Sequence, residues 1–123
     1  MALKKILVVS KDVYMLSFLG LGLGEDYEVL NTDITDEEGV VAVVSEKKPD
    51  LVILAIMIPG AEEIILGLRI RQSTEIPIIT LSNFKTGDGK VRIFSPKDRG
   101  YLGRDLTVSM LKHLIQRRIQ RVI

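Results

Sequence analysis

Short apolar runs alternate along the chain with segments whose apolar residues have helical spacing. The clearest run is Leu51-Val52-Ile53-Leu54, which lies between Pro49-Asp50 and Pro59-Gly60. An unbroken apolar run of this length is typical of a strand that is buried on both faces of its sheet. Such strands occur in parallel sheets that helices cover on both sides. The run therefore indicates an α/β protein.

The other apolar runs extend this pattern. Strands are predicted at 6–9, 27–30, 51–54 and 77–81. Helices are predicted at 12–23 with Met15, Leu16, Leu19 and Leu23 as apolar residues, at 35–46, around 64–70 and at 106–122. Thr35 and Glu38 have the spacing of a capping box at the start of the second helix. Strands joined by helices make right-handed crossovers, so a doubly wound parallel sheet is predicted.

Residues 83–96 depart from this alternation. Gly87 and Gly89 each cost about 1 kcal/mol in a helix, and Pro96 cannot lie in a helix interior. Residues 90–94 alternate polar and apolar side chains as a strand does. We therefore expect the fourth helix to be short, irregular or replaced by extended chain.

A glycine-rich run, Gly20-Leu21-Gly22-Leu23-Gly24, resembles a phosphate-binding loop. A loop of that kind must follow a strand and open a helix. This run lies at the end of a predicted helix, so a loosened helix end is the favoured interpretation.

Size and composition narrow the class of protein. The chain has 123 residues, and we expect residues 1–123 to form a single domain. It contains no cysteine, which excludes disulfides and thiolate metal sites. No apolar run reaches the ~18 residues that cross a bilayer, and the apolar stretch near the start is too short for a signal peptide. A cytoplasmic protein without membrane contact is expected.

Charge is segregated along the chain although the net charge is only +1. Residues 1–75 have 7 Lys and Arg against 13 Asp and Glu (−6), and residues 76–123 have 10 against 3 (+7). Solvated surface is the simpler interpretation. The sharper one is a basic partner face in residues 84–121, which would bind an acidic protein or the acidic half of a second copy. No acid follows Asp105, so the charge of the last helix is expected to be uncompensated locally. The arginines assigned to this face are Arg92, Arg99, Arg117, Arg118 and Arg121.

Ligand sites of open α/β sheets lie at the carboxyl ends of the strands. Ser10-Lys11-Asp12, Ala55 and Ser82 follow three predicted strands. They are therefore expected around one pocket.

The order and spacing of these segments resemble the receiver domain of two-component response regulators, over essentially the whole chain. The resemblance implies a flavodoxin-like three-layer sandwich with a five-stranded parallel sheet in the order 2-1-3-4-5. The segments that carry the resemblance are 6–9, 49–52, 57–60, 76–82, and Tyr101-Leu102 ahead of Arg104.

The resemblance also implies that the chemistry of the family is missing. Receivers close the third strand with an aspartate that takes the phosphoryl group, and Ala55 holds that position here. They bind Mg²⁺ through two acidic residues after the first strand, and Ser10 and Lys11 stand there, with only Asp12 acidic. Mg²⁺ requires oxygen ligands, and an ammonium group would repel it. No metal and no cofactor are expected in this degenerate, pseudo-receiver pocket.

The remaining pocket positions are partly kept. Ser82 resembles the hydroxyl that binds the phosphoryl group, and Tyr101 resembles the aromatic switch residue. Arg104 stands where the family has a lysine. Together with Lys11, these residues are expected to offer a weak site for a small anion.

The favoured function is a phosphorylation-independent receiver-like domain in two-component or phosphorelay signal transduction. It would act through protein-protein contacts and would not be an enzyme. One alternative is a receiver that is regulated by anion binding or keeps a residual phosphorelay role. Another is the N-terminal regulatory part of a longer DNA-binding response regulator. Contact with nucleic acid is expected only through such an output domain.

Overall fold

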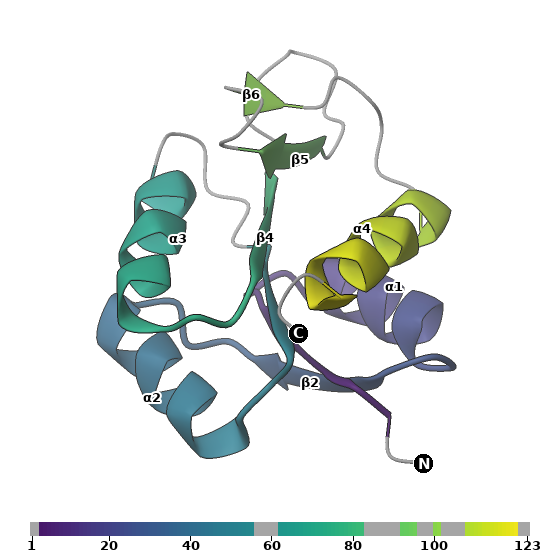
Figure 1. The fold of residues 1–123 in the computed structure, drawn as a ribbon, viewed down its shortest axis with the longest axis horizontal. Coiled ribbons are helices and arrows are strands. Elements are labelled where there is room, and N and C mark those ends of the chain that lie inside the picture. Colours follow the sequence, from purple (N-terminus) through teal and green to yellow (C-terminus); the bar gives the residue numbers. More distant parts are fainter. Residues whose placement is uncertain (1–2, 56–61, 83–91, 96–99, 102–107, 121–123) are drawn as a thin grey trace.

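The computed structural model describes residues 3–55, 62–82, 92–95, 100–101 and 108–120. Figure 1 shows α1 and α4 on one side of the sheet and α2 and α3 on the other. No helix in these ranges is long and apolar enough to cross a membrane. The elements in chain order are β1 (Lys5–Val9), α1 (Val13–Leu23), β2 (Glu28–Thr32), α2 (Glu37–Lys47), β3 (Leu51–Leu54), α3 (Glu62–Ser73), β4 (Ile78–Ser82), β5 (Arg92–Ser95), β6 (Gly100–Tyr101) and α4 (Val108–Gln120).

The strands form one six-stranded sheet in the order β2-β1-β3-β4-β5-β6. The pairs β1–β2, β1–β3 and β3–β4 are parallel. The predicted doubly wound α/β fold, with helices on both faces, is therefore confirmed. The predicted strand order is confirmed for the first four strands, 2-1-3-4.

The fifth position of the sheet corrects the expectation of an all-parallel sheet. β5 runs antiparallel to β4, with Leu81 opposite Ile93, and β6 runs antiparallel to β5. Only residues 83–91 lie between β4 and β5, whereas a parallel crossover takes a dozen or more residues. The extended chain predicted from the alternation at 90–94 is confirmed for Arg92–Ser95. The rest of the expected fourth helix lies outside the described residues.

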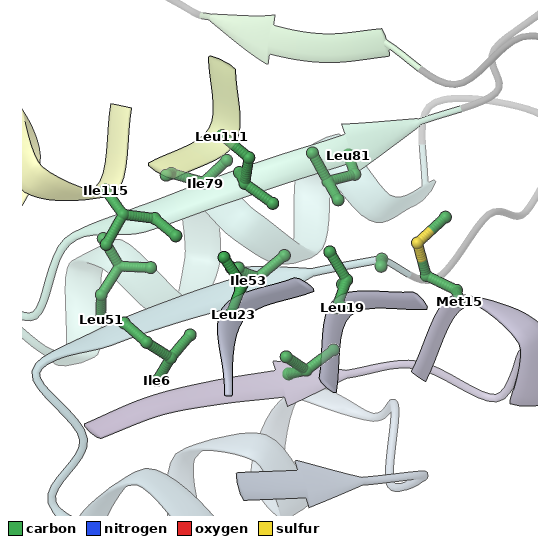
Figure 2. Packing of buried hydrophobic residues seen from close by; sticks show 12 residues of the cluster. Ile6, Met15, Leu19, Leu23, Leu51, Ile53, Ile79, Leu81, Leu111 and Ile115 are labelled. Carbon is green, nitrogen blue, oxygen red and sulfur yellow. The ribbon is translucent and has the colours of Figure 1, made fainter. Parts of the chain in front are cut away.

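Two apolar clusters cover the two faces of the sheet. Along β1, Ile6 and Val8 belong to the cluster under α1 and α4, whereas Leu7 and Val9 belong to the cluster under α2 and α3. This alternation follows from the two-residue period of a strand. All residues of β3 are fully buried, as its unbroken apolar run predicted. Figure 2 shows the first cluster, in which helix residues pack on strand residues; those labelled are Ile6, Met15, Leu19, Leu23, Leu51, Ile53, Ile79, Leu81, Leu111 and Ile115.

Aspartates cap the first two helices. The Asp12 carboxylate accepts hydrogen bonds from the N–H groups of Tyr14 at 2.9 Å and Met15 at 3.2 Å. In α2 the N-cap is Asp36, which accepts from the Gly39 N–H at 2.9 Å. The capping box predicted at Thr35 is therefore wrong by one residue. A carboxylate interacts more favourably with the positive end of the helix dipole than a neutral hydroxyl does.

The glycine-rich run lies within α1 and at its end, so the helix-end interpretation is confirmed. A Cβ on Gly22 would lie 2.7 Å from a methyl group of Val108, so this glycine permits the close approach of α1 to α4. Gly24 is the C-cap, and its N–H donates to the carbonyl of Gly20 at 3.0 Å. The run thus has a packing role and does not open a helix as a phosphate loop must.

Candidate functional site

The carboxyl ends of β1, β3 and β4 meet at one edge of the sheet because the three strands are parallel. Val9, Leu54 and Thr80 form one row across them. The ladder continues one residue further, since the Ala55 N–H donates to the Val9 carbonyl at 2.8 Å. Ser10 is held in the same way, by donation of its N–H to the carbonyl of Thr32 at 3.0 Å. We call this the carboxyl edge, and it brings Ser10 and Ala55 together as predicted from topology.

Ala55 is a buried part of the core. Its exposed fraction is 0%, and it belongs to the apolar cluster that contains Met15 of α1 and Leu81 of β4. A methyl group in that place has no nucleophilic atom and cannot form an acyl phosphate. Ala55 therefore supplies no nucleophile at the carboxyl edge.

The two polar residues next to it hold the start of α1. Ser10 is fully buried, and its hydroxyl oxygen accepts the Asp12 N–H at 3.0 Å. The Asp12 carboxylate in turn caps the helix through Tyr14 and Met15. Both side chains thus satisfy backbone N–H groups that would otherwise lack a partner. This gives Ser10 and Asp12 a structural role at the carboxyl edge.

Lys11 lies between these two residues and is exposed to solvent. Its ammonium group forms no ion pair with any residue in the described part of the chain. The structure thus places one positive charge at the mouth of the carboxyl edge, on the surface.

The residues of the carboxyl edge do not fit a Mg²⁺ site. Mg²⁺ takes oxygen ligands in near-octahedral geometry, usually with one or two carboxylates. Asp12 supplies the carboxylate nearest in sequence, and it is engaged as a helix cap. Within the described ranges no three His, Cys, Asp or Glu side chains lie close enough together to hold a metal ion.

The predicted anion pocket draws on residues that the structure describes only in part. Ser82 ends β4 at the carboxyl edge, and Tyr101 lies on β6, where it pairs with Phe94 of β5. Arg104 lies outside the described residues. The anion site of Lys11, Ser82, Tyr101 and Arg104 therefore stays a prediction.

The predicted basic face is also described in part. Arg117 is exposed in the last turn of α4, which also contains Arg118. Arg92 lies on β5. Arg99 and Arg121 lie outside the described residues.

One cation of α4 has a partner that sequence reasoning missed. The ammonium of Lys112 lies 2.6 Å from a carboxylate oxygen of Asp26, which follows α1. Lys112 is therefore compensated by an acid from a distant segment, which the expectation of a locally uncompensated helix did not include. The two residues are far apart in sequence and meet only because α1 and α4 pack on the same face of the sheet.

This ion pair gives the stability a defined pH dependence. The hydrogen bond that the Lys112 ammonium donates to the Asp26 carboxylate raises the pKa of Lys112 above its ordinary value of 10.5. Burial, and then the charge of Asp26, raise the pKa of neighbouring Tyr27 above 10.0. Both groups hold their protons more tightly when folded, so the stability they add is present below pH 10 and is lost as the pH rises through the raised pKa values. Asp26→Asn should make the loss of stability between pH 10 and pH 11.5 shallower in chemical denaturation; equal slopes would contradict it.

Comparison with known proteins identifies the fold. No protein-family model and no curated protein matches the chain. Among solved structures, the receiver domain of nitrogen regulatory protein C matches with a TM-score of 0.70 and 22% identity, over 98% of each chain. The N-terminal domain of the nisin resistance regulator NsrR, a lantibiotic response regulator, matches at 0.67 and 20% identity, over 94% of this chain and 97% of that one. A response regulator protein from Burkholderia multivorans matches at 0.55 and 21%, over 93% of each. The chain has the fold of response-regulator receiver domains.

Proposed function

We propose that residues 1–123 form one receiver-like domain that acts in two-component or phosphorelay signalling without being phosphorylated. The observation that carries this proposal is the buried Ala55 methyl group at the carboxyl end of β3. The engagement of the Ser10 hydroxyl and of Asp12 Oδ1 by backbone N–H groups supports it, because both side chains serve to start α1. The domain keeps the scaffold of a receiver and has no covalent switch.

A domain without a covalent switch must act through its surface. Its role is then to hold a partner, and the presence of that partner, not phosphorylation, changes the signal. The Ser10 hydroxyl and the Asp12 carboxylate are satisfied by backbone N–H groups, which supports a rigid carboxyl edge. No enzymatic activity belongs to this proposal.

The decisive test uses phosphoryl analogues. Beryllofluoride or acetyl phosphate with millimolar Mg²⁺ should leave the backbone NMR shifts of Ser10, Lys11 and Ala55 unchanged, because the edge offers neither acceptor nor metal ligands. The receiver domain of nitrogen regulatory protein C serves as the positive control under the same conditions. Saturable shifts at the carboxyl edge with either reagent, or with Mg²⁺ alone, would refute the proposal.

We further propose that the basic face of residues 84–121 binds an acidic protein surface. The +7 balance of residues 76–123 and the exposed Arg117 support this. Favourable interaction of Arg117 and Arg118 with the negative end of the α4 dipole is an alternative reason for their position. It does not account for the cations between 85 and 99.

Charge reversal separates the two explanations. We expect the triple variant Arg92→Glu, Arg99→Glu and Arg117→Glu to lose capture of the acidic partner at low salt. The parent protein should lose capture when added salt shortens the Debye length to ~8 Å or less. Lys47→Glu with Arg71→Glu is the matched control, since both residues are exposed cations on the α2 and α3 side. Capture that is insensitive to both the triple change and salt would rule this face out.

A further inference from the structure

Helix α1 presents apolar side chains to solvent. Tyr14 is 87% exposed, Leu21 is 84% exposed and Phe18 is 41% exposed. They are spaced by four and then three residues, so they form one continuous stripe along the helix. The opposite side of the helix packs in the core through Met15, Leu19 and Leu23.

The whole helix lacks charge. No Lys, Arg, Asp or Glu occurs from Val13 to Gly24. A surface helix normally carries charged residues on the side that faces water. An apolar stripe on an exposed helix face is a feature of surfaces that bind another protein.

Charged residues of opposite sign close the stripe at its two ends. Lys11 immediately precedes Asp12, the N-cap of α1, and Glu25 immediately follows Gly24, the C-cap, so the two charges flank the helix at its two ends. Both are exposed, and neither forms an ion pair within the described part of the chain. Lys112 is hydrogen-bonded to Asp26 and exerts only a longer-range attraction on Glu25. The Asp12 carboxylate caps the helix, so the charged groups left for a partner are the cation Lys11 at the start of the stripe and the anion Glu25 at its end.

We propose that α1 binds α1 of a second copy of this chain in antiparallel orientation. Lys11 and Glu25 are each seven residues from Phe18, so a two-fold axis at Phe18 brings the end of α1 that carries Lys11 beside the end of the other copy's α1 that carries Glu25. The same axis sets Tyr14 opposite Leu21 and Phe18 against its own symmetry mate, in reach of aromatic stacking. Every position of the stripe then meets a complementary one.

The charge pattern selects this occupant. Parallel pairing would place Lys11 against Lys11 and Glu25 against Glu25. In a second copy with antiparallel orientation, Glu25 lies at the end that faces Lys11 and Lys11 lies at the end that faces Glu25. α1 spans 11 residues, about 16 Å of helix, so the contact is smaller than the ~800 Å² per partner of a standard interface. The dimer is accordingly weak and depends on concentration.

The charged ends give a test that also reports orientation. Sedimentation velocity into the millimolar concentration range should show the parent dimerising. Lys11→Glu alone and Glu25→Lys alone should each weaken the dimer about tenfold, because each creates two like-charge contacts across the axis. An equimolar mixture of the two variants should restore it, because antiparallel pairing then sets opposite charges together at both ends.

Matched controls tie the effect to the stripe. Tyr14→Ser should weaken the dimer. Val13→Ser should not, although Val13 is 70% exposed on the same helix, because it lies about 100° round the axis from Tyr14. A parent that stays monomeric would overturn the proposal and leave the stripe to a different protein. A dimer that Tyr14→Ser leaves intact, or a mixture that fails to restore association, would overturn it as well. The basic-face triple variant should dimerise normally, so the two surfaces are tested separately.

Discussion

Leu19→Ala is expected to lower the free energy of unfolding by about 3 kcal/mol. Leu19 is fully buried in the cluster that α1 and α4 form on the sheet, which also contains Ile6 and Ile53 (Figure 2). Truncation removes apolar contact and leaves a cavity that the surrounding strands cannot fill, because β1 and β3 are fixed by their ladder. Urea denaturation followed by circular dichroism measures the change.

Leu21→Ala is the matched control, with the same chemical change two residues further along the helix. Leu21 is 84% exposed, so its truncation should alter the unfolding free energy by less than about 0.5 kcal/mol. It should instead weaken the proposed dimer. Similar stability losses in the two variants would show that α1 faces the sheet differently, which would remove the basis of both the core description and the stripe.

The parallel part of the sheet could be predicted because its strands leave little ambiguity. The run 51–54 is apolar at every position, and only burial on both faces suits such a run. The direction of β5 could not be predicted from its residues. Alternation at 90–94 indicates a strand, but parallel and antiparallel strands share that pattern, and the choice depends on the length of the connection from β4.

Other features could not be predicted because several interpretations fit the same residues. Thr35 and Asp36 are adjacent and both are good N-caps, so only the geometry decides that Asp36 holds the helix. The Lys112–Asp26 pair links residues with no local sequence relation. Helix α1 has two apolar stripes, because its sequence is apolar all round. The stripe with Leu19 could be assigned to the core. The spacing alone did not indicate that the second stripe, with Tyr14 and Leu21, stays exposed to solvent.

The carboxyl edge was accessible to prediction only in outline. Parallel topology brings Ser10 and Ala55 to one edge, whatever their side chains do. The Ser10 hydroxyl and the Asp12 carboxylate accept backbone hydrogen bonds because of where α1 begins. The apolar spacing of a sequence predicts the first residue of a helix only to within one or two positions. Whether Lys11 lies in the pocket or in solvent depends on that same geometry, and the structure has it exposed.

Ala55→Asp is expected not to restore phosphorylation and to destabilise the protein by about 3 kcal/mol at pH 7. The change places a carboxylate in the apolar cluster next to α1, whose members are all apolar side chains. Burial raises the pKa of the introduced carboxyl group, so the folded state prefers its protonated form. The penalty should therefore shrink as the pH falls toward the ordinary value of about 3.9. Denaturation at pH 7 and pH 4.5, with acetyl-phosphate labelling, measures both effects.

Ala42→Asp is the control for the chemical change itself. Ala42 is exposed on α2, so its replacement should cost helix propensity and weak repulsion from Glu38 and Glu46, about 1 kcal/mol, with only a small gain as the pH is lowered. The triple variant Ser10→Asp, Lys11→Asp and Ala55→Asp supplies the carboxylates that Mg²⁺ requires, and it is the variant with the best prospect of labelling. Labelling of Ala55→Asp alone would mean that the carboxyl edge can align a metal and a phosphodonor without those acids. The proposal of a phosphorylation-independent domain would then have to be abandoned in favour of a receiver that has lost only its acceptor.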